Sequence, residues 1–123
     1  MTRSDELMLA AIRMKSQLSI NGREVTVNGE NVTIWLYGVP TVVVRFGKGD
    51  IRINGMIKVS RKSAKVLNAI LKTYTDCSVK GMGKCWVLER NDGEIVPLGE
   101  NLATIPMTKS EITKNEIEDY IEY

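Results

Sequence analysis

The chain has 123 residues and a mass of 13.8 kDa, which fits one domain because a single hydrophobic core usually spans about 100 to 150 residues. Hydrophobic residues make up 43% and charged residues 26%, the composition of a globular protein and not of a disordered one. The sequence contains no histidine, so it lacks the most common general base and metal ligand near neutral pH. It also lacks a membrane-length apolar run and an apolar N-terminal block, and we expect a cytoplasmic protein.

The N-terminal third predicts one helix followed by strands. Ser4 ahead of Asp5 and Glu6 suits a helix N-terminus, so residues 4–18 should form an amphipathic helix. Its expected apolar face consists of Leu7, Ala11, Met14 and Leu18. Alternation of apolar and polar residues predicts strands over 23–27, 32–37, 41–46 and 50–54, separated by turns at 21–22, 28–29, 38–40 and 47–49.

The remainder predicts two more helices and four short strands. A strand through Ile57 and Val59 leads to a helix over 61–74, whose apolar side should contain Ala64, Leu67, Ile70, Leu71 and Tyr74. Strands are expected over 77–80, 84–89 and 94–98. Thr108 and Glu111 have capping-box spacing, which predicts a C-terminal helix over 108–123, either packed or exposed as an acidic tail. The expected fold is therefore α+β: a single domain over 1–123, with an antiparallel sheet or small barrel and N-terminal, central and C-terminal helices.

Several classes of active site are excluded by residue type. Cys77 and Cys85 cannot complete a four-ligand zinc site without histidine or a second cysteine pair, and we expect free thiols. The glycines at 81 and 83 do not fit a phosphate loop, because a strand follows them where that motif requires a helix. Asp92 and Glu94 flank a turn glycine, where solvated acids are common. We expect no metal, no cofactor and no enzymatic activity.

The distribution of charge along the chain is uneven. Residues 1–44 carry no net charge, residues 45–84 carry +8 and residues 85–123 carry −6. On the helix over 61–74, Arg61, Lys65 and Lys72 fall within about 40° of one another, and Asn68 lies in the same stripe. Such a stripe matches a polyanion, although a solvated outer helix face would have the same composition.

The strands carry a second candidate surface. Alternation places Trp35 and Tyr37 on the non-core side of the sheet, together with Val43, Arg45 and Arg52. Aromatic and cationic side chains on a sheet are the usual platform for unstacked bases. A helix or a second subunit covering this face is the alternative interpretation.

The segment from Leu36 to Leu88 resembles small uncharacterised proteins encoded by bacteriophages. Those proteins carry a Leu-His-Gly element, a strand with glycine and an aromatic residue, a Thr-Thr-Lys-like helix start, an Arg-Leu-Asn-Ala-Leu-Leu helix and a closing strand with tryptophan. The counterparts are Leu36-Tyr37-Gly38, Ile53-Asn54-Gly55, Val59-Ser60-Arg61-Lys62-Ser63, Val66-Leu67-Asn68-Ala69-Ile70-Leu71 and Trp86-Val87-Leu88. Tyr37 replaces the histidine, and Met56 stands where an aromatic residue is usual. The resemblance implies a phage accessory protein in the cytoplasm of a host bacterium, without a known activity.

The acidic C-terminus gives a further resemblance. Residues 116–123 alternate acidic and apolar side chains and end in an aromatic residue. This segment is similar to the tails of single-stranded-DNA-binding proteins, which recruit partner proteins and compete with nucleic acid for the basic groove. An ordinary helix that packs through Ile117, Tyr120 and Ile121 would account for the same residues.

These observations support three functions of different kinds. The first is a nucleic-acid-binding domain in which Trp35 and Tyr37 stack on bases and phosphates meet Arg45, Arg52, Lys58, Arg61, Lys62, Lys65 and Lys72. The second is an inhibitor of a host or defence enzyme, with a partner-binding segment made of Glu116, Glu118, Asp119, Glu122 and Tyr123. The third is the sequestration of a small nucleotide signal by the same arginines. No membrane partner is expected, and a homodimer through unpaired edge strands fits any of the three.

Overall fold

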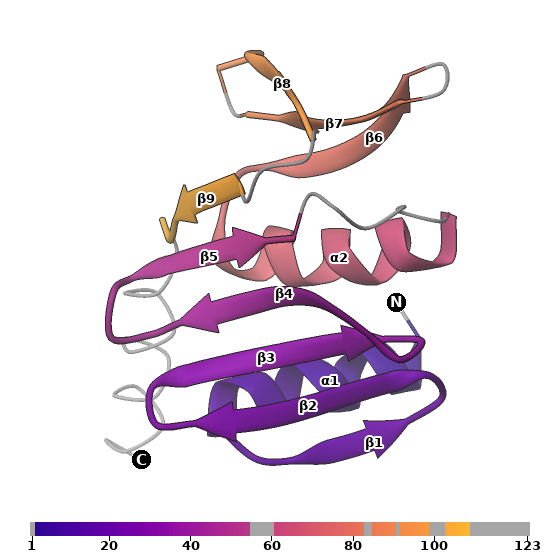
Figure 1. Cartoon of the computed structure of the whole chain (residues 1–123), viewed down its shortest axis with the longest axis vertical. Coiled ribbons are helices and arrows are strands. Elements are labelled where there is room, and N and C mark those ends of the chain that lie inside the picture. The colour runs from indigo at the N-terminus through magenta and orange to yellow at the C-terminus, as the bar shows by residue number, and fades with distance from the viewer. Residues whose placement is uncertain (1, 55–60, 83–84, 91, 99–102, 109–123) are drawn as a thin grey trace, which may run out of the picture.

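The structure is a computed structural model that describes residues 2–54, 61–82, 85–90, 92–98 and 103–108. The described residues form two helices and nine strands (Figure 1). In chain order these are α1 (Arg3–Met14), β1 (Leu18–Ile20), β2 (Arg23–Asn28), β3 (Asn31–Leu36), β4 (Val39–Arg45), β5 (Asp50–Ile53), α2 (Arg61–Tyr74), β6 (Ser78–Met82), β7 (Cys85–Glu89), β8 (Ile95–Pro97) and β9 (Ala103–Pro106).

The strands belong to two antiparallel sheets. The first has six strands in the order β1-β2-β3-β4-β5-β9, and the second has three in the order β6-β7-β8. The chain builds the first sheet as consecutive hairpins, leaves it after β5 to form α2 and the second sheet, and returns as β9 beside β5. Both helices lie on one face of the six-stranded sheet, and Figure 1 shows α1 behind β2 and β3.

The predicted fold class is wrong in two respects. The sequence predicted one sheet or a small barrel with three helices, whereas the described residues form two separate sheets and two helices, α+β at most. The six-stranded sheet is not closed, because β1 and β9 are its unpaired edges among the described strands. The predicted C-terminal helix lies outside the described residues apart from Thr108. That residue is not helical, and its backbone N–H donates to the carbonyl of Tyr74 at the end of α2 (2.9 Å). The short strand expected over 57–59 also lies outside the described residues.

Helix α1 is shorter than predicted, and a different side of it is buried. It starts after Thr2, whose side-chain oxygen accepts from the Asp5 N–H, and ends at Lys15 in the left-handed conformation (φ 52°). Leu18, predicted to close the helix, begins β1 instead. Of the predicted apolar face only Ala11 is buried; Leu7 is 36% and Met14 70% exposed. The buried side consists of Asp5, Met8, Ala11 and Ile12.

The shift of α1 follows from an ion pair between distant parts of the sequence. The Asp5 carboxylate accepts from Arg23 Nε at 2.8 Å, and both side chains are only about a tenth exposed (10% and 11%). The pair satisfies the charge of the inward-facing carboxylate, so α1 can turn Met8 and Ile12 toward the sheet. An aspartate in the first helical turn gives no sign in the sequence that it is buried.

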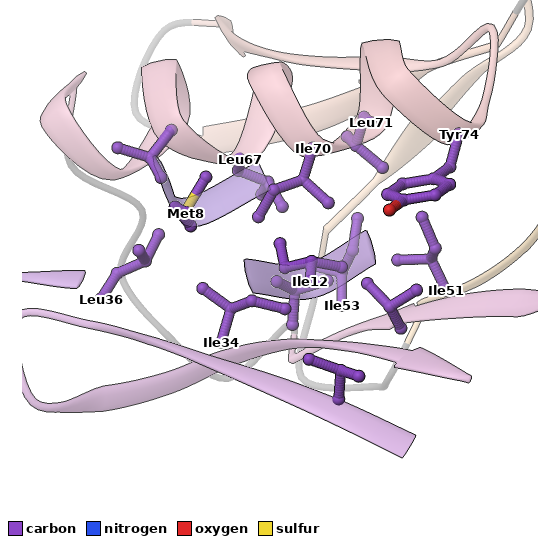
Figure 2. Close-up of a cluster of buried hydrophobic side chains, with 14 of the residues drawn as sticks. Met8, Ile12, Ile34, Leu36, Ile51, Ile53, Leu67, Ile70, Leu71 and Tyr74 are labelled. Atoms are coloured by element: carbon purple, nitrogen blue, oxygen red, sulfur yellow. The ribbon is translucent and has the colours of Figure 1, made fainter. Parts of the chain in front are cut away.

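Helix α2 matches its predicted bounds and its predicted apolar side. Ala64, Leu67, Ile70, Leu71 and Tyr74 are all buried, as predicted. Figure 2 shows Leu67, Ile70, Leu71 and Tyr74 facing α1 and the inner side chains of β3 and β5. The same core extends to Val79 and Leu88, so α2 also packs on the second sheet. The inner side of α2 therefore packs on both sheets.

Candidate nucleic-acid interface

The outer side of α2 carries four cations. Arg61, Lys62, Lys65 and Lys72 are all exposed, and the helix contains no acidic residue. We call these four side chains the cationic face. Among the described residues, no ion pair or hydrogen bond involves the side chains of Arg61, Lys62 or Lys65. The cationic face is therefore a strip of exposed cations about 16 Å long, since eleven residues separate its ends, and the side chains of Arg61, Lys62 and Lys65 in it are not paired with an acid in the described part of the chain.

The charges in the first turn of α2 are opposite to those that stabilise a helix, whereas Lys72 in its last turn follows the stabilising order. Acids near the N-terminus and bases near the C-terminus complement the helix dipole, and α1 follows this rule with Asp5 and Glu6 first and Arg13 last. The first turn of α2 instead contains Arg61 and Lys62 and no acid. These two charges oppose the dipole, and the positive potentials of the side chains and of the helix end add together.

Asn68 lies within the cationic stripe but is used by the fold. Its Nδ2 donates to the carbonyl oxygen of Val79 at 3.0 Å, and its Oδ1 accepts from the Val79 N–H at 2.7 Å. The carboxamide thus pairs with the edge of β6 as a neighbouring strand would. Asn68 connects α2 to the second sheet and is not available to a ligand.

Two shallow depressions lie along the outer side of α2 and share Asn68 and Lys72. The larger, about 460 Å³, also contains Lys65 and Ala69, together with Thr2 and Asp5 from the start of α1. The smaller, about 330 Å³, extends along residues 75–78 toward β6. Since Asp5 is paired with Arg23, its charge is already compensated. The cationic face is therefore flanked by α1 on one side and by the start of β6 on the other.

The opposite side of the molecule is the outer sheet face. It includes the following side chains, which point away from the helices: Glu24, Thr26, Thr33, Trp35, Val43, Arg45, Asp50, Arg52 and Thr104. The strand register places five of them in one row across the sheet, in the order Thr26, Thr33, Val43, Arg52 and Thr104. Neither described helix covers this face, so the alternative of a helix packed on it is wrong for the described part of the chain.

Two pairs of polar side chains on the outer sheet face bind one another. Trp35 is half-buried, and its Nε1–H donates to Thr26 Oγ1 at 3.0 Å. Arg45 binds Asp50 through two hydrogen bonds of 2.6 and 2.5 Å, and the side chains of both residues are less than a fifth exposed (17% and 16%). The hydrogen bond from Arg45 is the main reason that the pKa of Asp50 lies below its usual range. Arg45 is therefore not a free cation, whereas the buried Nε of Arg52 on the same side has no hydrogen-bond partner in the described part of the chain.

Tyr37 lies in a turn and does not extend the row of Trp35. It occupies the β3–β4 turn in the left-handed region (φ 53°), and its N–H donates to the Gly22 carbonyl at 2.7 Å. Its ring lies against Gly22, where an added Cβ would approach Cδ1 and Cε1 to 2.5 Å. The Cδ1–Cε1 side of the ring therefore lies against Gly22, although Tyr37 is 47% exposed.

The predicted nucleic-acid site is thus divided. The sequence predicted one surface, but Trp35, Arg45 and Arg52 lie on the outer sheet face, whereas the cationic face lies beyond the helix layer on the other side. Lys58 and the predicted partner-binding residues Glu116, Glu118, Asp119, Glu122 and Tyr123 lie outside the described residues. The structural role of Asn68 was missed, because its pairing with Val79 depends on a contact eleven residues away that has no local signal.

Comparison of the chain with protein-family models, with curated proteins and with solved structures finds no match. In the part of the chain that the structure describes, no three histidine, cysteine, aspartate or glutamate side chains are grouped as metal ligands. None of the helices described there has the length and apolar character to cross a bilayer.

Proposed function

We propose that this protein binds nucleic acid without enzymatic action, through the phosphate backbone and the cationic face of α2. The proposal depends on one observation: α2 has four exposed cations, no acid, and two of the cations at the helix end where the dipole is positive. Such an arrangement costs stability in the free protein. An anion bound along the helix compensates that cost.

Phosphates are the anions that fit this surface best. Phosphates follow one another at short intervals along a strand, and the cations on α2 follow one another along about 16 Å in the same way. Each neutralised phosphate releases counterions, so affinity comes from several weak contacts and falls as salt rises. Two depressions beside the helix leave space for a strand next to Lys65 and Lys72.

The proposal gives no stacking role to Trp35 or Tyr37. The indole of Trp35 is on the side of the sheet away from α2, and Tyr37 lies in the β3–β4 turn with the Cδ1–Cε1 side of its ring against Gly22. Arg45 is engaged by Asp50. A cytoplasmic location, where nucleic acid is accessible, and a phage accessory role are part of the same proposal.

The test is fluorescence anisotropy with labelled oligonucleotides in about 50 mM salt. The double variant Lys62→Gln/Lys65→Gln should bind more weakly. The negative slope of log K against log salt should become shallower by about two, one for each lost phosphate contact. Arg13→Gln/Lys48→Gln is the matched control, because it removes the same charge from exposed positions outside the cationic face. Absence of binding by the wild-type protein, or equal weakening by both double variants, would refute the proposal.

A further inference from the structure

We infer that the nucleic acid bound by the cationic face is double-helical and is recognised by its backbone, independently of base sequence. This inference rests on the proposed function and specifies its substrate. Two structural features carry it: the absence of an aromatic ring on the described outer side of α2, and the presence of neighbouring segments along both flanks of α2.

Single strands are usually held by rings on which the bases stack. The outer side of α2 presents Arg61, Lys62, Lys65, Asn68, Ala69, Lys72 and Thr73, and none of these is aromatic. Tyr74, the aromatic residue of the helix, is 2% exposed and forms an edge contact with Phe46 in the core. The described surface around the cations therefore offers an unstacked base no ring, and the advantage that single-stranded-DNA-binding proteins gain from stacking is missing.

The neighbours of α2 also limit what the helix can read. A helix that reads bases must enter a major groove about 12 Å wide and about 8.5 Å deep, which requires it to project from the protein. Thr2 and Asp5 line one flank of α2, and Thr75 to Ser78 line the other, around depressions that are shallow and open. With α1 on one flank and residues 75–78 on the other, we expect α2 to meet phosphates along the groove edge rather than to enter the groove. Contacts limited to phosphates carry no sequence information.

Charge density then favours the duplex. Counterion release gives a salt slope of about 0.9 per contact on duplex DNA and about 0.7 on a single strand. For three to four contacts, and equal affinity at 1 M salt, these slopes give the duplex an advantage of about six- to elevenfold at 50 mM salt.

The experiment compares a duplex of about 20 base pairs with its separate strands, in two unrelated sequences, by anisotropy at 50 mM salt and across a salt series. The duplex should bind about six- to elevenfold more tightly than either strand, and the two duplexes should agree within about twofold. Tyr37→Asn is a matched ring-removal variant, because asparagine tolerates the left-handed conformation of this turn. It should leave the affinity for single strands unchanged.

The outcomes separate the two proposals. Equal or tighter binding of single strands, a strong difference between the two duplex sequences, or loss of single-strand binding in Tyr37→Asn would overturn the inference and leave the proposed function standing. No binding of any oligonucleotide would overturn the proposed function itself. A duplex preference that persists unchanged in Lys62→Gln/Lys65→Gln would place the duplex site elsewhere on the protein and also refute the inference.

Discussion

The pairing of Asn68 with Val79 should be one of the main links between α2 and the second sheet. Val79 is 3% exposed, so removal of the carboxamide leaves a buried N–H and a buried carbonyl without their partner. Two lost hydrogen bonds of this kind cost about 2 to 4 kcal/mol. Alanine regains up to about 0.7 kcal/mol of helix propensity. We therefore expect Asn68→Ala to lower the free energy of unfolding by about 1.5 to 3 kcal/mol.

The variant Asn68→Asp separates the two hydrogen bonds. Its carboxylate still accepts from the Val79 N–H but turns a second oxygen toward the Val79 carbonyl, which raises the pKa of this carboxyl in the folded state. A raised folded-state pKa means that the protonated form supports the fold. Asn68→Asp should therefore recover stability as the pH falls toward and below about 4, where the protonated acid can donate to that carbonyl.

The assay is urea unfolding of the wild type, Asn68→Ala and Asn68→Asp, with amide hydrogen exchange at Val79. Lys65→Ala serves as the control for changes on the outer side of α2 and should alter stability by less than about 0.5 kcal/mol. A loss below about 0.5 kcal/mol in Asn68→Ala, with unchanged exchange at Val79, would show that the bridge does not stabilise the fold.

Three further predictions test the fold and its ionisable groups. Met8→Ala should cost about 2 to 5 kcal/mol because Met8 is fully buried, whereas Leu7→Ala should cost less than about 1 kcal/mol; equal costs in urea unfolding would contradict the orientation of α1. The pKa of Asp50 is lowered by the hydrogen bond from Arg45, so this pair stabilises the fold above the unfolded-state pKa of about 4 and its contribution is lost as the pH falls through the lower folded-state value. The difference in urea midpoint between wild type and Asp50→Asn should accordingly shrink between pH 7 and pH 3, and a constant difference would argue against the pair. Burial raises the pKa of Tyr74 to about 12, so its phenolate absorbance should appear only above the range of an ordinary tyrosine, and stability should fall as the pH rises past about 10; ionisation of all tyrosines near pH 10 in the folded protein would refute this.

The parts of the fold that were predicted correctly are those in which local pattern and tertiary packing agree. In α2 the apolar residues recur at helical spacing on one side, and every charged residue falls on the other, so the bounds and the buried side could both be derived from the sequence. The consecutive hairpins had glycine turns and alternating residues, and β2 to β5 lie within two residues of their predicted positions.

The errors occur where distant contacts outweigh the local pattern. The inward side of α1 depends on the Asp5–Arg23 pair, and its end depends on Lys15, which adopts a conformation that usually attracts glycine. Strand β9 has four residues and ends at Pro106, a residue that argues against a strand except at an edge. The division of the sequence into two sheets was not visible either, because strands of both sheets have the same alternation.

The candidate site shows the same limit. Helical periodicity located the cations of α2 correctly on one side of one element. Whether Trp35 shares a surface with them depends on which face of the sheet the helices cover, and that choice is made by the whole core. The sequence therefore predicted the two surfaces separately but could not place them relative to each other.

Because the inner side of α2 packs on both sheets, the helix couples the stability of one sheet to the stability of the other. A ligand held on the outer side of α2 favours every state in which the helix is intact, and an intact helix is packed on the six-stranded sheet through Leu67 and Ile70 and fixed to β6 through Asn68. Bound polyanion should therefore raise the melting temperature of the whole domain in one transition, by an amount that grows with ligand concentration. The smaller sheet would thereby gain protection from a ligand that is held on the outer side of the helix packed against it.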